Sequence, residues 1–378
     1  MSWFEQNTRV VSLVEALSDP AVPFHEEFVA RAVARETARL RQVGPVSLRR
    51  DAVGNLFLSY QPLPVGAQTM VMAAHMDHPG FEVVSFTSST VEMRVLGGLP
   101  EQFCQDTGVL LVNEHGDRTP ATITRKIQDK LWEAVAATRI ESAPLFAVWD
   151  VPSFELDDHV VWGLAMDDLA GCALQIAALE EIMRRGVNVN VTAVFHRAEE
   201  VGFLGAAAVA LGGVLPADAL IISLEASKAL PGAEVNQGPV IRLGDKMYIF
   251  DPNAAGYLEQ AGELLREEGM HIQKRIMDGG TCEASLYHAA GYSATGLAVP
   301  LLNYHNTAPD RVDKEGVGIY DLNVGARLLV ETAELFAIET RPRRMEFVRR
   351  VESRLQNAAG KFISYTASEL LQLSDIKE

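Results

Sequence analysis

Hydrophobic positions in the first part of the chain predict helices followed by a strand. Apolar residues recur with a helical period over residues 10–17 and again over residues 28–40. The segment DAVGNLFLSY (51–60) then predicts a turn at Gly54 and Asn55 that leads into a strand. We therefore expect two helices and one strand before the apolar run that begins at Thr69.

The hydrophobic pattern changes character between about residues 82 and 162. Short β-prone pieces follow one another with turn signals between them, and only residues 130–137 show a trace of helical periodicity. The pieces read EVVSF, VEMRVL, GVLLVN, ATITRKI, LFAVWDV and HVVWGL. Closely spaced strands of this kind predict a small β-barrel or sandwich.

From Asp167 onward, long helical patterns alternate with single apolar runs. The runs 189–195, 219–224 and 294–299 are typical of strands, and residues 172–183 form a helical stripe. Such alternation is the signature of a parallel sheet covered by helices. The chain is thus expected to be an α/β protein, with a mixed, mostly parallel sheet flanked by helices and an inserted small all-β, barrel-like domain.

These patterns also predict the domain organisation. Residues 1–81 and 163–345 would form one discontinuous catalytic domain, interrupted by the all-β insertion at residues 82–162. The basic helical pattern that starts near Arg341 predicts a C-terminal helical extension at residues 346–378.

Composition narrows the choice of partner and compartment. The 378 residues carry a formal charge of −17, which argues against nucleic acid or an anionic membrane as the main partner. No apolar run reaches the roughly 18 residues that a membrane span requires, and the N-terminal segment lacks a secretory pattern. The three cysteines show no metal-type spacing, so we expect a reducing, cytoplasmic location.

Ionisable side chains follow four of the predicted strands, and another group begins a predicted helix. In open α/β sheets, ligand sites form outside the carboxyl ends of the strands. Singly, each group has an ordinary explanation, such as helix capping or a solvated turn. Jointly, they predict one site built from His75, Asp77, Asp167, Glu199, Glu200, Glu225 and His305.

This set of side chains indicates metal chemistry. Two histidines and several carboxylates cannot all be ionised at close range unless a cation compensates them. Imidazole and carboxylate ligands suit zinc, with cobalt or manganese as alternatives, and a pair of ions bridged by one carboxylate fits equally well. Neighbouring side chains on an extended segment point apart, so one of Glu199 and Glu200 would bind metal while the other serves as general base.

Several motifs resemble the glutamyl/lysyl aminopeptidases, two-metal peptidases that form hollow tetrahedral particles and whose relatives include proteins described as deblocking aminopeptidases or endoglucanases. AHMDHPGF resembles that family's AHMDEIGF, and AEEVGFLGA resembles its EEVG-x-x-GA motif. AMDDLAG, DGGTCEA with the later NYHN, and DAVGNL resemble three further family segments in the same order. The all-β stretch between His75 and Asp167 stands where the family carries a small β domain.

The resemblance implies a role for each residue. Asp167 would bridge two metal ions, most simply zinc. His75 and Glu225 would complete one site, and Glu200 and His305 the other. Glu199 would be the general base, and Asp77 would orient His75. The implied function is removal of the N-terminal residue of short peptides by a metal-activated water, in a homo-oligomer built from dimers, with a dodecamer as one such assembly.

Four departures from the family motifs surround the site without deleting a proposed ligand. Glu225 stands in place of Asp, Leu169 in place of Arg, Cys282 in place of Asp, and His78 in place of Glu. They leave other functions open: a related amidohydrolase (deacylase or carboxypeptidase), a thiol hydrolase built on Cys282, or a metal-binding protein without activity.

Overall fold

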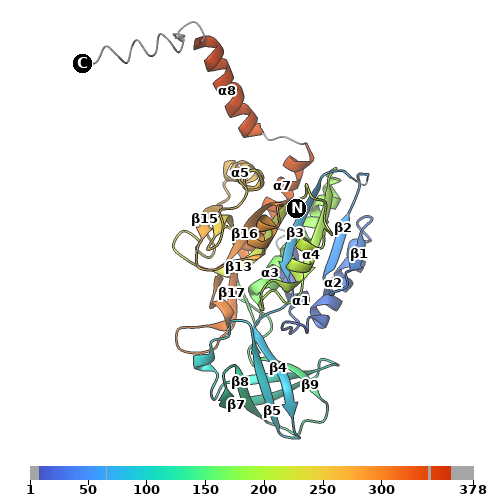
Figure 1. Ribbon diagram of the computed structural model, residues 1–378, viewed down its shortest axis with the longest axis vertical. Helices are drawn as coiled ribbons and strands as arrows, with labels where there is room; N and C mark the ends of the chain where they lie inside the picture. Colours follow the sequence, from blue (N-terminus) through green and yellow to red (C-terminus); the bar gives the residue numbers. More distant parts are fainter. Residues whose placement is uncertain (1–7, 65, 339–341, 359–378) are drawn as a thin grey trace, which may run out of the picture. The chain divides into compact units, whose positions relative to one another are not determined.

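The computed structural model describes residues 8–64, 66–338 and 342–358. The chain divides into two compact units after Ile338. The first unit contains a large sheet with its covering helices and a small β-barrel, and Figure 1 shows the barrel strands gathered together apart from the sheet. The second unit contributes one described helix, α8 (Pro342–Ala358). Across the described residues, no helix combines the length and apolar character needed to cross a membrane.

The sheet has a parallel core and antiparallel edges. Strands β12, β3, β13 and β16 run parallel to one another, in the overall order β1-β2-β12-β3-β13-β16-β17-β11-β10, and β14 and β15 join beside β16. The strands are β1 (Ser47–Arg50), β2 (Leu56–Tyr60), β3 (Thr69–His75), β10 (Glu155–Leu156), β11 (Val160–Gly163), β12 (Asn190–His196), β13 (Leu220–Lys228), β14 (Val240–Asp245), β15 (Gln273–Met277), β16 (Ser293–Leu302) and β17 (Glu315–Gly318).

Helices cover both faces of this sheet. Along β3, Met70, Met72 and Ala74 belong to the larger hydrophobic core, whereas Val71 and Ala73 belong to a second core on the other face, as the two-residue period of a strand requires. The larger core contains residues of α1 (Thr8–Leu17), α2 (Glu27–Leu40), α3 (Met166–Arg185), α5 (Pro252–Glu267) and α7 (Ile319–Ala337); the second contains residues of α4 (Leu204–Leu211) and α6 (Glu283–Ala289).

The inserted domain is a closed antiparallel barrel of six strands in the order β4-β5-β8-β7-β6-β9. These are β4 (Gly80–Phe86), β5 (Thr90–Leu96), β6 (Gly108–Asn113), β7 (Arg118–Gln128), β8 (Leu131–Ala136) and β9 (Pro144–Trp149), with a short 3-10 helix, η2 (Glu101–Phe103), between β5 and β6. A mixed sheet flanked by helices, with an inserted barrel, is therefore confirmed.

Two local expectations differ from the structure. Within residues 130–137, where helical periodicity was expected, Leu131–Ala136 form strand β8, because Trp132 and Ala134 alternate into the barrel interior. The HVVWGL piece forms β11, which pairs with β17 of the large sheet and not with the barrel. The predicted domain boundaries stay a prediction, as does the extension beyond residue 358, which lies outside the described residues.

Candidate metal centre

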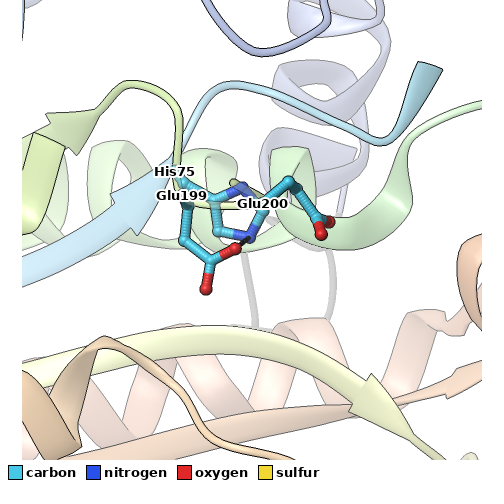
Figure 2. A group of neighbouring side chains, drawn as sticks. All are labelled: His75, Glu199 and Glu200. Atoms are coloured by element: carbon cyan, nitrogen blue, oxygen red, sulfur yellow. Dashed lines mark ion pairs between the residues drawn. The ribbon is translucent and has the colours of Figure 1, made fainter. Parts of the chain in front are cut away.

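Strand register brings the predicted side chains to one edge of the sheet. His75 ends β3 and is paired in register with His196, the last residue of β12, so Glu199 and Glu200 follow directly beside it. Figure 2 shows the carboxylates of Glu199 and Glu200 on opposite sides of the His75 ring. Glu225 lies in neighbouring β13, and His305 lies in η3 (Tyr304–Asn306), just after β16.

Asp167, at the start of α3, lies between the two histidines. Its Oδ1 is 3.3 Å from His75 Nε2, and its Oδ2 is 3.7 Å from His305 Nε2. His305 Nε2 is also 3.3 Å from Glu200 Oε1. The two oxygens of one carboxylate thus face two different imidazoles, which is the arrangement that a bridging ligand requires.

The side chains form two overlapping groups with spacing suited to metal ions. His75, Asp167 and Glu225 offer ligand atoms within 4.8 Å of one another, and so do Asp167, Glu200 and His305. A third such group joins His75 to the adjacent pair Glu199 and Glu200. All of the residues predicted to bind metal are therefore brought together.

Buried polar atoms without partners support a cation at this position. His75 Nε2, Asp167 Oδ1 and Glu225 Oε2 are buried and accept or donate no hydrogen bond. Such atoms are costly unless something coordinates them. Burial raises the pKa of Glu225 to about 8 and that of Glu199 well above its usual range. Ionised carboxylates at neutral pH therefore need positive charge nearby, and the donor set fits a pair of divalent ions.

Asp77 connects the two halves of the centre through its main chain and through its carboxylate, whose Oδ1 also lies 3.7 Å from His75 Nδ1. The backbone carbonyl of Asp77, at 2.9 Å, accepts the hydrogen bond from His75 Nδ1. Its carboxylate instead accepts the backbone N–H groups of Glu199 and Glu200, at 3.0 and 3.1 Å. Asp77 thus orients His75 through its main chain and holds the Glu199–Glu200 turn through its side chain.

Glu315 supports the centre and was not predicted from the sequence. Its Oε2 accepts the backbone N–H of Asp167 at 3.0 Å, and its Oε1 accepts that of His305 at 2.7 Å. One buried carboxylate therefore fixes the main chain beneath both residues. Its sequence context, a short EGVG strand, carries no signal of this role.

His78, one of the departures from the family motifs, also has a structural partner on each side. Its Nδ1 lies 2.7 Å from the Asp167 carbonyl, and its Nε2 lies 2.9 Å from the Asn306 side-chain oxygen. His78 therefore links the backbone at Asp167 to the residue after His305.

A pocket that opens to solvent is lined in part by Glu225. Its walls include the 279–281 loop, Tyr304, the exposed Lys228 and the buried Arg242. Arg242 is 3% exposed; Nη1 donates to Ser227 Oγ at 3.0 Å, while Nε has no hydrogen-bond partner. Nothing in the sequence pattern distinguishes this arginine from those on the surface.

Cys282 does not have the surroundings of a nucleophile. The residue is 1% exposed, and burial raises the pKa of its thiol to about 12. A reactive cysteine requires a stabilised thiolate, so a thiol hydrolase is disfavoured by this geometry.

Known proteins share this architecture. The family model of the M42 glutamyl aminopeptidases matches residues 133–317. An aminopeptidase from the archaeon Desulfurococcus kamchatkensis is 23% identical, with a TM-score of 0.71 over 86% of this chain and 94% of that chain.

Two TET peptidases have the same fold. That of a Thaumarchaeota archaeon from marine sediment is 18% identical, with a TM-score of 0.72 over 87% of this chain and 99% of the other. The Pyrococcus horikoshii TET1 peptidase, described as assembling into a tetrahedron or a large octahedral shell, is 22% identical, with a TM-score of 0.71 over 86% and 99%. The family match over residues 133–317 and the fold shared with these peptidases make this chain similar to the M42 glutamyl aminopeptidases, a family of metallopeptidases.

Proposed function

We propose that this protein is a metal-dependent aminopeptidase that removes the N-terminal residue of short peptides. The observation that carries the proposal is the pair of ligand groups that share Asp167, with Glu199 beside them. A purely structural metal site has no need of an additional buried carboxylate next to its ligands, whereas a hydrolase needs one as a base.

In this proposal, Asp167 would contribute its carboxylate to both metal sites. His75 and Glu225 complete the first metal site, and Glu200 and His305 complete the second. Zinc is the preferred metal because imidazole and carboxylate ligands suit it, with cobalt and manganese as alternatives. The ions, when bound, supply positive charge that polarises the scissile carbonyl and acidifies water.

Glu199 acts as the general base. Its Oε2 lies 3.9 Å from His75 Nε2, on the side of that ring away from Glu200. The carboxylate takes a proton from the attacking water and passes it to the leaving amine. Asp77 keeps Glu199 in place, because its carboxylate anchors the backbone N–H of Glu199 and of the following residue.

The pocket beside Glu225 favours an acidic N-terminal residue in the substrate. Arg242 lines the pocket and is almost fully buried, so its positive charge is little screened by water and attracts a substrate carboxylate that enters the pocket. Lys228 lines the same pocket and adds positive charge. The 279–281 loop also lines the pocket, and its two glycines leave open space where a Cβ would stand.

Activity assays test this function and separate it from the alternatives. Protein saturated with Zn²⁺ or Co²⁺ is expected to cleave glutamyl and aspartyl p-nitroanilides and short peptides, and to leave N-acetylated peptides intact. Preference for N-acyl substrates would instead identify a deacylase, and cleavage from the carboxyl end a carboxypeptidase. Intact substrates in every assay, with metal restored, would contradict catalysis.

Assembly into a homo-oligomer is part of the proposal. The barrel exposes several large apolar side chains, and an oligomer interface would cover them; they include Val84, Phe86, Val135 and Leu145. Light scattering on the purified protein distinguishes a monomer from a dimer or a dodecamer. A cytoplasmic location stays a prediction.

A further inference from the structure

A loop of the inserted barrel lies against the proposed metal centre. Gly97 and Gly98 follow strand β5, and both lie against residues of the second metal site. His305 Nδ1 donates a hydrogen bond to the Gly98 carbonyl at 2.8 Å. This bond leaves His305 Nε2 free to face Asp167 and Glu200, as a metal-binding imidazole requires.

Both glycines are required by close contacts with these ligands. A Cβ on Gly98 would lie 2.9 Å from His305 Nδ1 and 3.1 Å from Cε1. A Cβ on Gly97 would lie 3.2 Å from Glu200 Cβ, and the φ of +79° at Gly97 also disfavours any other residue. The barrel therefore touches His305 and Glu200, the two ligands that belong to the second site alone.

The His305 ring has little freedom to move away from such a Cβ. It stacks on Tyr304 with ring centroids 3.7 Å apart, and its backbone N–H is held by Glu315. The first site is held differently: His75 Nδ1 donates to Asp77 and the His75 main chain lies in the large sheet. The two histidine ligands thus depend on different parts of the fold.

We propose that Gly98 is a positioning residue through which the barrel sets the affinity of the second metal site, and of that site only. The inference rests on the proposed metal centre. Because coupling between two events is reciprocal, metal at the second site also fixes the barrel loop in place. Metal binding at the second site should then change the mobility of the barrel loop, and a change in the loop should alter metal binding at that site.

Calorimetric titration of the metal-free protein with Zn²⁺ against a competing chelator tests the inference. The wild-type protein is expected to bind two ions per subunit in two steps. Gly98→Ala should weaken the second step by about 10-fold to 100-fold, as loss of a ligand's supporting contact does, and leave the first step unchanged. Gly256→Ala is the control, because a Cβ there meets nothing and both steps should stay as in the wild type.

Hydrogen exchange on the wild-type protein gives an independent readout if the variant fails to fold. Exchange at the backbone amides of residues 97–99 should slow when the second equivalent of Zn²⁺ is added, and not with the first. Equal weakening of both steps, an unchanged second step in Gly98→Ala, or protection of the loop by the first equivalent would overturn the inference. A wild-type protein that binds no metal would instead refute the proposed function itself.

Discussion

Replacing Arg242 by methionine should remove the preference for an acidic N-terminal residue. The substitution keeps an apolar stem of similar length and removes the buried guanidinium, whose Nε is unpartnered. A hydrogen bond to a charged group contributes about 1.5–3 kcal/mol, so the ratio of kcat/KM for glutamyl over leucyl p-nitroanilide should fall by about 10-fold to 150-fold.

The ratio of kcat/KM for the two substrates separates this effect from changes at the metal site. The positive charge of Arg242 is one of the influences that lower the pKa of Glu225, so its loss weakens metal binding for both substrates alike. Assays at saturating Zn²⁺, with metal content measured, remove that contribution. Lys228→Met is the matched control: this lysine lines the same pocket but is exposed, and an exposed charge contributes about 1 kcal/mol or less. Equal losses on both substrates in Arg242→Met, or a leucyl preference in the wild type, would refute the reasoning.

Three further predictions concern the metal centre. Glu199→Gln should lower kcat by about 100-fold to 10,000-fold with two metals still bound, whereas Glu114→Gln, on the barrel surface, should have no effect; loss of metal together with activity would make Glu199 a ligand instead. Glu315→Gln should lower the melting temperature and weaken metal binding, because a neutral amide supports two backbone N–H groups less well than the carboxylate; unchanged binding by calorimetry would contradict this. Chelators should abolish activity and thiol alkylation should not, since Cys282 is buried; the reverse result would restore the thiol mechanism.

The metal-free protein should lose stability as the pH rises from about 7 to 9. Burial alone would lower the pKa of His305, but the nearby Glu200 carboxylate raises it to about 9, and burial raises the pKa of Glu225 to about 8. A group whose pKa is raised by folding binds its proton more tightly in the folded state than in the unfolded state. Its contribution to the free energy of unfolding is therefore lost as the pH rises through its folded-state pKa. Calorimetry should therefore show that the melting temperature of the metal-free protein falls as the pH rises. The difference in melting temperature between the zinc-bound and the metal-free protein should widen over the same range. A constant difference would contradict the account.

The ionisable side chains at the ends of the strands could be predicted from the sequence, because strands follow local hydrophobic patterns. Apolar runs predicted the strands on which the site depends, and the carboxyl ends of parallel strands meet at one edge. The sequence alone therefore predicts that His75, Glu225 and His305 lie close together. Sheet membership was harder to predict: β11 has the same β-prone composition as the barrel strands, and only its pairing with β17 assigns it to the large sheet.

Contacts made by the main chain escaped the sequence reasoning. The bond from His75 goes to the Asp77 carbonyl, and Gly98 supplies a carbonyl to His305, neither of which depends on a recognisable side chain. Arg242 and Glu315 are visible only as ordinary charges until the fold buries them. Such roles depend on tertiary distances that no local pattern encodes.

The central claim is that two divalent ions share the Asp167 carboxylate. Anomalous diffraction at the zinc edge, from crystals of the zinc-loaded protein, tests it most directly. The account predicts two peaks, one beside His75 and Glu225 and the other beside Glu200 and His305, with Asp167 between them. A single peak, or zinc bound elsewhere while these side chains remain uncoordinated, would contradict it.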